Sequence, residues 1–214
     1  MQTQKDDIKN EILYIAKKEF LEKGFYGSKV REISEKSYIS TGNIYTYFNS
    51  KNDLFYAIVF PAYDLIQKNI ALLRNYDLGS LKNMNSEDLK DLLHDHLTIF
   101  LNELNRYYDE AYILFLKSKG SNYENIKETI IEEITEISFC FKDYISENYK
   151  DQNVHLSDFF IHNLVSFIVN FFLEMIMHKK EIENSKTYLL ELIDFLFFGI
   201  SNNISISNIK RGCL

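Results

Sequence analysis

Apolar residues recur along the chain at the three- and four-residue spacing of an amphipathic helix, and no apolar–polar alternation is long enough to predict a strand. In the first such run, Ile8, Ile12 and Phe20 lie on one helix face. Gly24 then supplies a C-terminal stop. This pattern predicts a first helix over about residues 5–23.

Two short helices are predicted next. Ser28 is the expected N-cap of a helix of barely two turns, and residues 37–39 form a turn. Ser40 caps a second short helix over 41–48. Ile39 and Ile44 flank that cap at the two positions of a hydrophobic staple, which fixes the angle at which the chain enters the second short helix.

Longer helices fill the rest of the chain. Ser50 as cap with Asp53 three residues later is close to a capping box and opens a helix to about residue 74. Pro61 removes a backbone hydrogen bond inside that helix, so we expect a kink there. Residues 75–85 are predicted as a loop. The remaining predicted helices cover 86–104, 106–119, 123–149, 154–178 and 185–205. The predicted fold class is therefore all-α, with about nine helices.

The composition fits a folded helical chain in a reducing compartment. Hydrophobic residues make up 46% of the 214 residues, and one proline with seven glycines argues against a disordered, collagen-like or many-turned β chain. Cys140 and Cys213 lie far apart and cannot form a disulfide framework or a four-cysteine zinc site, which favours a cytoplasmic location. Polar side chains interrupt the most apolar stretch, 159–177, so no membrane span is predicted.

Positive charge is concentrated near the N-terminus although the whole chain carries −7. Between Lys17 and Lys51, seven lysines and arginines stand against four glutamates. A short basic segment in an acidic chain is suited to a localised contact with phosphate. The alternative is a chance fluctuation of a few charges.

The two short helices, joined by a tight turn behind a supporting helix, match a helix-turn-helix, whose second helix enters the major groove of DNA. Gly42 lets the backbone approach DNA closely. Ser28 and Ser50 are at predicted helix N-termini, which attract phosphate, and Lys51 adds a charge beside the second. Hydrogen-bonding side chains on the second helix are Thr41, Asn43, Tyr45, Thr46 and Tyr47. Tyr45 has the alternative of packing on the first helix, and Asn43 that of serving only the cap.

The run from Ile12 to Leu54 resembles the DNA-binding domain of TetR/AcrR-type transcriptional regulators. Its most specific block is Ser-Thr-Gly-Asn-Ile-Tyr-Thr-Tyr-Phe over 40–48, followed by Ser-Lys-Asn-Asp-Leu over 50–54. Three positions depart from the family pattern: Lys29 replaces a hydroxyl residue, Ser37-Tyr38 replaces the Ala-Gly of the turn, and Tyr47 replaces a common histidine. The candidate DNA contacts are Ser28, Lys29, Thr41, Gly42, Asn43, Tyr45, Thr46, Tyr47 and Lys51.

The resemblance implies a division into a DNA-binding domain over 1–52 and an effector-binding and dimerisation domain over 53–214. It implies that the helices at 154–178 and 185–205 pair with their copies in a homodimer; the alternative is that both are buried in their own subunit. A palindromic operator favours the dimer, because it needs two recognition helices roughly 34–36 Å apart. The candidate residues for a small-molecule pocket are Tyr63, His96, Phe100, Tyr112, Phe139, Asn163 and Phe167.

No catalytic, cofactor or metal site is predicted. His94 and His96 are two residues apart and point to different helix faces, which makes a poor metal pair. The nucleotide-binding and nucleophile motifs of common enzyme classes are missing. We therefore expect no enzyme, but a homodimeric repressor that binds a palindromic DNA operator and is released by a small-molecule effector. The alternative is a TetR-like DNA-binding protein that lacks an effector and is controlled by a protein partner.

Overall fold

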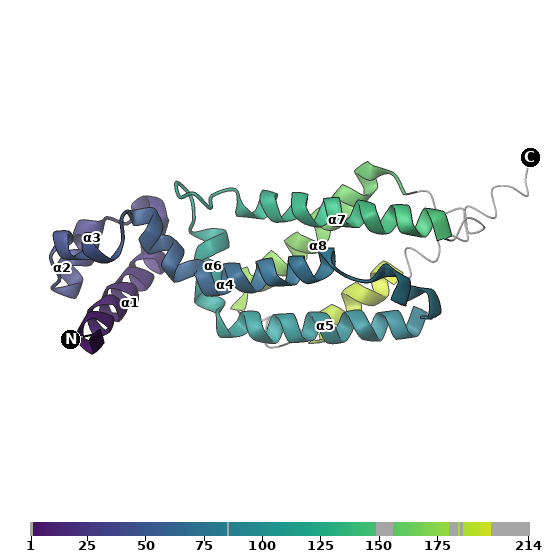
Figure 1. Ribbon diagram of the computed structural model, residues 1–214, viewed down its shortest axis with the longest axis horizontal. Coiled ribbons are helices and arrows are strands. Elements are labelled where there is room, and N and C mark those ends of the chain that lie inside the picture. Colours follow the sequence, from purple (N-terminus) through teal and green to yellow (C-terminus); the bar gives the residue numbers. More distant parts are fainter. Residues whose placement is uncertain (1, 85, 149–155, 180–183, 185, 198–214) are drawn as a thin grey trace, which may run out of the picture. The chain divides into compact units, whose positions relative to one another are not determined.

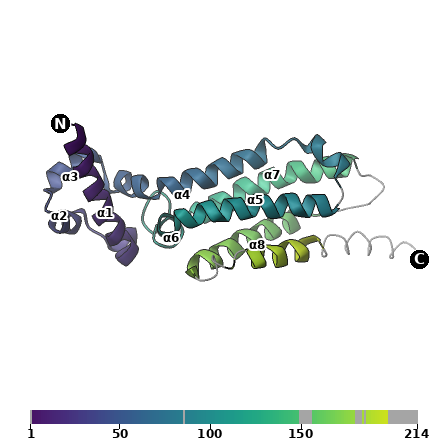
Figure 2. The same cartoon turned by 90° about the horizontal axis from the view of Figure 1, so that it is seen from below.

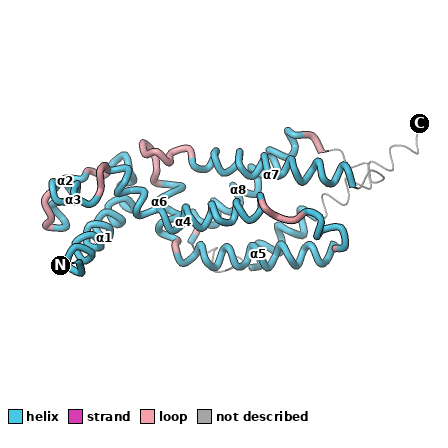
Figure 3. The backbone as a smooth tube through the Cα atoms, in the orientation of Figure 1, coloured by secondary structure: helices cyan, strands magenta, loops and turns pink. Residues whose placement is uncertain are grey.

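The structure is a computed structural model that describes residues 2–84, 86–148, 156–179, 184 and 186–197. Regular structure in this part of the chain is helical throughout, which confirms the predicted all-α class (Figures 1 and 3). The elements are α1 (Gln2–Gly27), α2 (Val30–Ser37), α3 (Thr41–Tyr47), α4 (Lys51–Arg74), the 3-10 helix η1 (Leu78–Asn83), α5 (Ser86–Arg106), α6 (Tyr108–Leu116), α7 (Ile126–Asn148) and α8 (Asp158–Met177). Residues 186–197 are also helical.

The chain divides into two compact units. Unit 1 comprises residues 1–67 and 106–127, so it holds α1 to α3, most of α4, and α6 with the segment that follows it. Unit 2 comprises residues 68–105 and 128–214. The proposed domain boundary between residues 52 and 53 stays a prediction.

The core of unit 1 is built from the apolar faces that the periodicity predicts. Ile12, Phe20 and Phe55 are fully buried. The ring of Phe55 meets the edges of Phe20 and Phe25 at centroid distances of 5.3 Å. Because each large buried side chain contributes about 1.5–3 kcal/mol, this cluster is the main force that holds α1 against α4.

Gly24 interrupts α1, as its sequence position predicts. Its backbone has φ 69 and ψ 174, a conformation that a side chain would strain. The turn at Gly24 lets the amide of Phe25 donate to the carbonyl of Lys117 at 2.7 Å. A Cβ at Gly24 would lie 3.3 Å from that same carbonyl oxygen, so the close approach of the two backbones also favours glycine.

Unit 2 is a set of long helices that lie alongside one another (Figures 1 and 2). Leu101, Ile161 and Leu189 belong to its buried core. The rings of Phe100 and Phe172 meet edge to face at 6.3 Å. The helix at 186–197 is tied to α5 by the ion pair of Lys90 with Asp194, at 2.7 Å.

Several predicted boundaries are corrected. The residue at the N-cap of α2 is Lys29, without a side-chain cap, and not Ser28. The predicted loop at 75–85 contains η1, because the Asp77 carboxylate accepts the amide of Gly79 at 3.0 Å and starts a turn. The helices predicted over 106–119, 123–149 and 154–178 begin two to four residues later, as α6, α7 and α8. For the last predicted helix, residues 198–205 lie outside the described part.

The apolar helix α8 is long enough to cross a membrane by length and composition, with a mean hydropathy of 1.7. A third of the residues in its most apolar window are buried inside the structure. Core helices of soluble proteins meet the same criterion, so this feature by itself is weak evidence for a membrane span.

Candidate nucleic-acid interface

The second short helix, α3, has a buried side and an exposed side. Its N-terminus is capped by Ser40, whose hydroxyl accepts the amide of Asn43 at 3.2 Å, as predicted. Ile44 is 1% exposed and Phe48, at the C-cap, is 5% exposed, so these two side chains anchor the helix on the core of unit 1. The other face of α3 is open to solvent.

The structure distributes the nine candidate DNA contacts over three environments. The exposed ones are Lys29, Gly42, Asn43, Tyr45 and Thr46. Half-buried ones are Thr41, Tyr47 and Lys51, and Ser28 is buried. Tyr45 is 46% exposed, so its ring does not fill the core behind α3. The exposed members line α3 and the start of α2.

Gly42 stands at an open position of α3. No atom lies within 4 Å of the place that a Cβ would occupy, and its backbone is helical. Glycine in a helix costs about 0.5–1 kcal/mol relative to alanine. The packing of the described residues therefore gives no reason for glycine here, and the predicted close approach of DNA to Gly42 stays a prediction.

The turn between α2 and α3 is made by a tyrosine in a left-handed conformation. Tyr38 has φ 55 and ψ 22, the one positive φ among the described non-glycine residues. Its side chain is 97% exposed. The departure from the family's Ala-Gly turn therefore leaves the turn possible, but at the conformational cost of a residue with a Cβ.

Ser28 faces the interior of unit 1. Its hydroxyl donates to the carbonyl of Gly24 at 2.6 Å and lies 3.2 Å from the carbonyl of Glu19. These carbonyls belong to the last turns of α1, so the hydroxyl stabilises the end of that helix. It is 2% exposed and has no open path to a phosphate in this conformation.

Lys51 links the start of α4 to the end of α1. Its ammonium donates to the carbonyls of Phe25 and, at 2.6 Å, of Ser28. It also lies 4.2 Å from the centroid of the Phe25 ring. Burial lowers the pKa of the Lys51 ammonium. Two of the three N–H groups of the Lys51 ammonium are thus used within unit 1. Only the third is left for the predicted contact with a phosphate.

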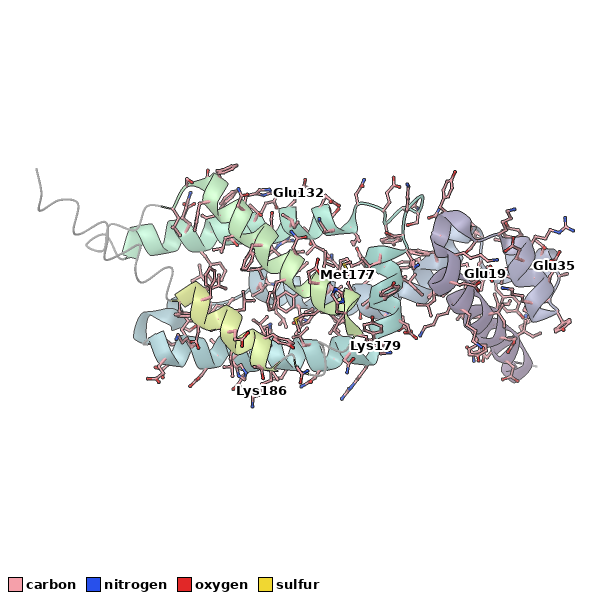
Figure 4. All side chains as sticks on the ribbon, turned by 180° about the vertical axis from the view of Figure 1, so that it is seen from behind. Glu19, Glu35, Glu132, Met177, Lys179 and Lys186 are labelled. Atoms are coloured by element: carbon pink, nitrogen blue, oxygen red, sulfur yellow. The ribbon has the colours of Figure 1, made fainter. Side chains whose placement is uncertain are left out.

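A buried carboxylate fixes α2 against α1. Glu19, labelled in Figure 4, is 1% exposed. Its carboxylate pairs with Lys36 of α2 and with Lys23, the latter at 2.5 Å. Lys23 also reaches Glu32 of α2 at 2.5 Å. Burial alone would raise the pKa of Glu19, but the hydrogen bonds from the two lysines outweigh it and lower the pKa.

The sequence analysis did not single out this network. The four-residue spacing of Glu19 and Lys23 was a usable local signal. The partners on α2, Glu32 and Lys36, are brought close by the fold, and no local sequence pattern indicates them.

A second set of contacts ties α1 to α6 within unit 1. Lys17 pairs with Glu110 at 2.8 Å and with Asp109 at 3.3 Å. Farther along the chain, the amide of Asn122 donates to the side-chain oxygen of Asn52 in α4 at 2.9 Å. The surface formed by α2 and α3 is therefore supported by segments from both ends of unit 1.

The seven candidate pocket residues are spread over the structure. Tyr63 and Tyr112 belong to unit 1, where Tyr63 packs against the rings of Tyr56 and Tyr123. The other five belong to unit 2: His96, Phe100, Phe139, Asn163 and Phe167. Asn163 and Phe167 are exposed on α8. None of the seven lines a pocket that described residues of α4, α7 and the segment after α4 form in unit 2.

A capped helix-turn-helix with a core-anchored second helix and a polar outer face is typical of DNA-binding transcription regulators. Residues 12–58 match the family model of bacterial regulatory proteins of the tetR family. The N-terminal part of the chain is therefore similar to the DNA-binding domain of the tetR family of regulatory proteins.

Two solved structures share the fold of this chain. A transcriptional regulator from Aquifex aeolicus VF5 is 24% identical, with a TM-score of 0.50 over 88% of this chain and 99% of that chain. NalD, the secondary repressor of the MexAB-OprM multidrug efflux pump in Pseudomonas aeruginosa, is 15% identical, with a TM-score of 0.53 over 89% and 95% of the two chains. A search of curated proteins gave no match. At these identities the likeness extends to the fold alone.

Proposed function

We propose that this regulator is a cytoplasmic homodimer that binds a palindromic operator as a repressor and is released by a small-molecule effector. The observation that carries the DNA-binding part is the two-sided α3. Ile44 fixes the helix on the core, while Tyr45 and its polar neighbours remain in solvent at an N-terminus that is already capped. A helix of this kind is ready to enter a major groove without rearrangement.

The proposed contacts divide by chemistry. Thr41, Asn43 and Thr46 carry short side chains that hydrogen-bond to base edges, and Gly42 lets the helix backbone approach them. Tyr45 and Tyr47 offer hydroxyls to phosphates at the two sides of the groove. Lys29 supplies a phosphate charge at the start of α2. Ser28 is left out of this set, because its hydroxyl is buried and bound to α1.

The exposed face of α8 supports the homodimer. Phe159 is 79% exposed and Phe167 46% exposed, and Phe195 of the helix at 186–197, whose ring contacts that of Phe167, is 64% exposed. Burial of each such ring against a second copy contributes about 1.5–3 kcal/mol.

Three polar side chains on α8 already donate a hydrogen bond within their own helix. The amides of Asn163 and Asn170 donate to the carbonyls of Phe159 and Ser166, at 2.7 and 2.8 Å. The hydroxyl of Ser166 donates to the carbonyl of His162 at 2.8 Å. A second copy that covers this face would therefore leave these three donors paired, which removes a penalty of about 1–3 kcal/mol for each of them.

In this proposal, α4 transmits the effect of effector binding that releases the protein from its operator. This helix passes from unit 1 into unit 2 and contains Pro61, so a change in unit 2 can reach unit 1 along one covalent element. Operator and effector would then oppose each other through a coupling free energy of about 1–3 kcal/mol. The similarity to a repressor, NalD, is in keeping with this sign of regulation. A regulator without an effector, controlled by a protein partner, is the competing possibility.

The DNA contacts are tested with an operator selected from random duplex DNA by the full-length protein. The double variant Thr41→Ala/Tyr45→Ala should bind that operator at least about 30-fold more weakly, because it loses two contacts of about 1–3 kcal/mol each. Tyr14→Ala, an exposed tyrosine on α1 of the same unit, is the matched control and should bind normally. Unchanged affinity of the double variant would remove α3 as the recognition helix.

A further inference from the structure

Unit 2 contains a pocket whose lining residues are not among the residues predicted from the sequence to bind DNA or an effector. Its volume is about 220 Å³. One wall is the last turn of α4 with the segment that follows, through Leu73, Arg74, Tyr76 and Leu78, and the opposite wall is one face of α7, through Glu136, Ile137, Cys140 and Phe141. The pocket shares no residue with the seven predicted effector contacts.

The lining is apolar inside and polar at few points. Leu73, Leu78 and Phe141 are half-buried and Ile137 is buried, whereas Arg74, Glu136 and Cys140 are exposed. The Tyr76 hydroxyl lies 3.4 Å from the Ser80 hydroxyl beside the pocket. A concave apolar surface with a small number of polar groups is the usual composition of a small-molecule site.

The size of the pocket limits its ligand. A cavity of about 150 Å³ lined by leucine, isoleucine and phenylalanine is enough to bind benzene, and drug-sized ligands need roughly 300–1,000 Å³. The volume here lies between these values, so it fits a single ring with one substituent. The flat faces of Phe141 and Tyr76 suit an aromatic ring.

The charged group at the pocket that is best suited to hold a ligand is Arg74. Among the described residues it has no ion-pair or hydrogen-bond partner, so its guanidinium offers its donors to an incoming group. The planar guanidinium binds a carboxylate through two parallel hydrogen bonds. Glu136 accepts no hydrogen bond from a described residue either, and it is a like charge for such a ligand.

We propose that this pocket binds small single-ring aromatic carboxylates, with the ring between Leu73, Leu78 and Phe141 and the carboxylate on Arg74. The site goes beyond the proposed function, because it does not depend on operator binding or on the predicted effector contacts. Glu136 weakens the binding of anions and thereby sets an upper limit on affinity. We expect dissociation constants on the order of 1 mM for benzoate, a ligand of few atoms.

The Cys140 thiol reports occupancy. The experiment uses the full-length protein with Cys213→Ser, and measures the rate at which a colourless aromatic disulfide reagent modifies Cys140. Benzoate should slow this modification in a saturable way, while benzylamine, a ring of the same size with a cation, should not. Benzamide, which is neutral, should protect at least about fivefold more weakly than benzoate, since it lacks the charge-assisted bonds.

Two variants give opposite expected results. Arg74→Met should weaken benzoate protection about tenfold, and Glu136→Gln should strengthen it about two- to threefold by removing a like charge. Arg106→Met, an exposed arginine in unit 1, is the matched control and should leave protection unchanged. Melting curves of all variants establish that each is folded.

Three results would overturn the proposal. The first is that benzoate leaves the modification rate of Cys140 unchanged, and the second is that it protects Cys140 equally well in Arg74→Met and in the parent. The third result is that benzylamine protects Cys140 better than benzoate does and that Glu136→Gln abolishes this protection. The last would make the pocket a cation site. The assay contains no DNA, so its result does not depend on whether the protein is a repressor. That proposal is tested separately by operator binding.

Discussion

The left-handed Tyr38 between α2 and α3 allows a stability change to be worked out from the structure. A non-glycine residue in this conformation costs about 1–2 kcal/mol, because its Cβ approaches the next carbonyl oxygen. The ring itself is 97% exposed, so its removal loses almost no packing. Tyr38→Gly removes the steric cost and adds the backbone entropy of glycine, about 0.5–1 kcal/mol.

The expected net effect of Tyr38→Gly is a stabilisation of about 0.5–1 kcal/mol. For a chain of this length, that raises Tm by about 1–4 °C. The measurement is thermal unfolding followed by circular dichroism, with chemical denaturation as a second probe of the free energy. Tyr38→Ala is the matched control: it loses the same ring but keeps a Cβ, and should change stability by less than about 0.5 kcal/mol.

The comparison of the two variants isolates the backbone contribution. If the Tyr38→Gly protein is no more stable than the Tyr38→Ala protein, the turn does not carry the backbone strain that φ 55 implies. That result would refute the expected stabilisation. Operator binding gives a separate readout, because strained residues persist where they serve a function. Weaker DNA binding by both variants at unchanged or higher stability would identify the exposed ring of Tyr38 as an additional contact.

Two further substitutions test the supports of the helix-turn-helix. Glu19→Gln should lower the free energy of unfolding by about 1–3 kcal/mol, discounted for the partial exposure of its lysine partners, as measured by chemical denaturation. The folded pKa of Glu19 lies below its ordinary value of 4.5, so the carboxylate stabilises the fold above that pH and loses this contribution as the pH falls through the folded pKa. The stability difference between Glu19→Gln and the parent should therefore shrink in acid. A difference that grows in acid would contradict the network. Lys51→Met should weaken binding to all DNA sequences and, if the third N–H reaches phosphate, flatten the salt dependence by about 0.9 in slope; an unchanged slope with lower stability would make Lys51 a purely internal link.

Local sequence rules predicted the elements that local chemistry determines. Ser40 and Ser50 cap α3 and α4 as expected, since each hydroxyl accepts the amide three residues ahead, at 3.2 and 3.0 Å. The break of α1 at Gly24 follows from the same kind of rule. These signals lie within one turn of the residue they act on, and the sequence alone contains them.

Tertiary contacts decided the features that the sequence analysis missed. The helix predicted to end at Lys119 ends at Leu116, next to Lys117, whose carbonyl accepts the amide of Phe25. Ser28 meets the local criteria for an N-cap, but its hydroxyl turns to the carbonyls of α1. The partners in both cases are fixed by the fold, so periodicity and capping rules could not identify them.

The positive charge of the N-terminal segment is used mostly inside the protein. Lys17, Lys23 and Lys36 pair with carboxylates, Arg31 pairs with Glu35 at 3.0 Å, and the Lys51 ammonium holds two carbonyls. Two cations of this segment have no carboxylate or carbonyl partner among the described residues: Lys18, whose ammonium contacts the hydroxyl and ring of Tyr14, and Lys29. The charge count that first suggested a phosphate contact therefore overstates the charge offered to DNA.

Lys23, Lys36 and Lys51 instead fix the helices that surround α3. A helix of seven residues is too short to be stable alone in water, so its geometry depends on what surrounds it. Ile44 and Phe48 hold it to the core, while the Glu19 network and Lys51 fix α2 and α4 on either side of it. Sequence discrimination by short side chains requires placement to within a fraction of an ångström. If α3 is the recognition helix, as we propose, the basic residues of this segment serve recognition mainly by fixing the helices on either side of it.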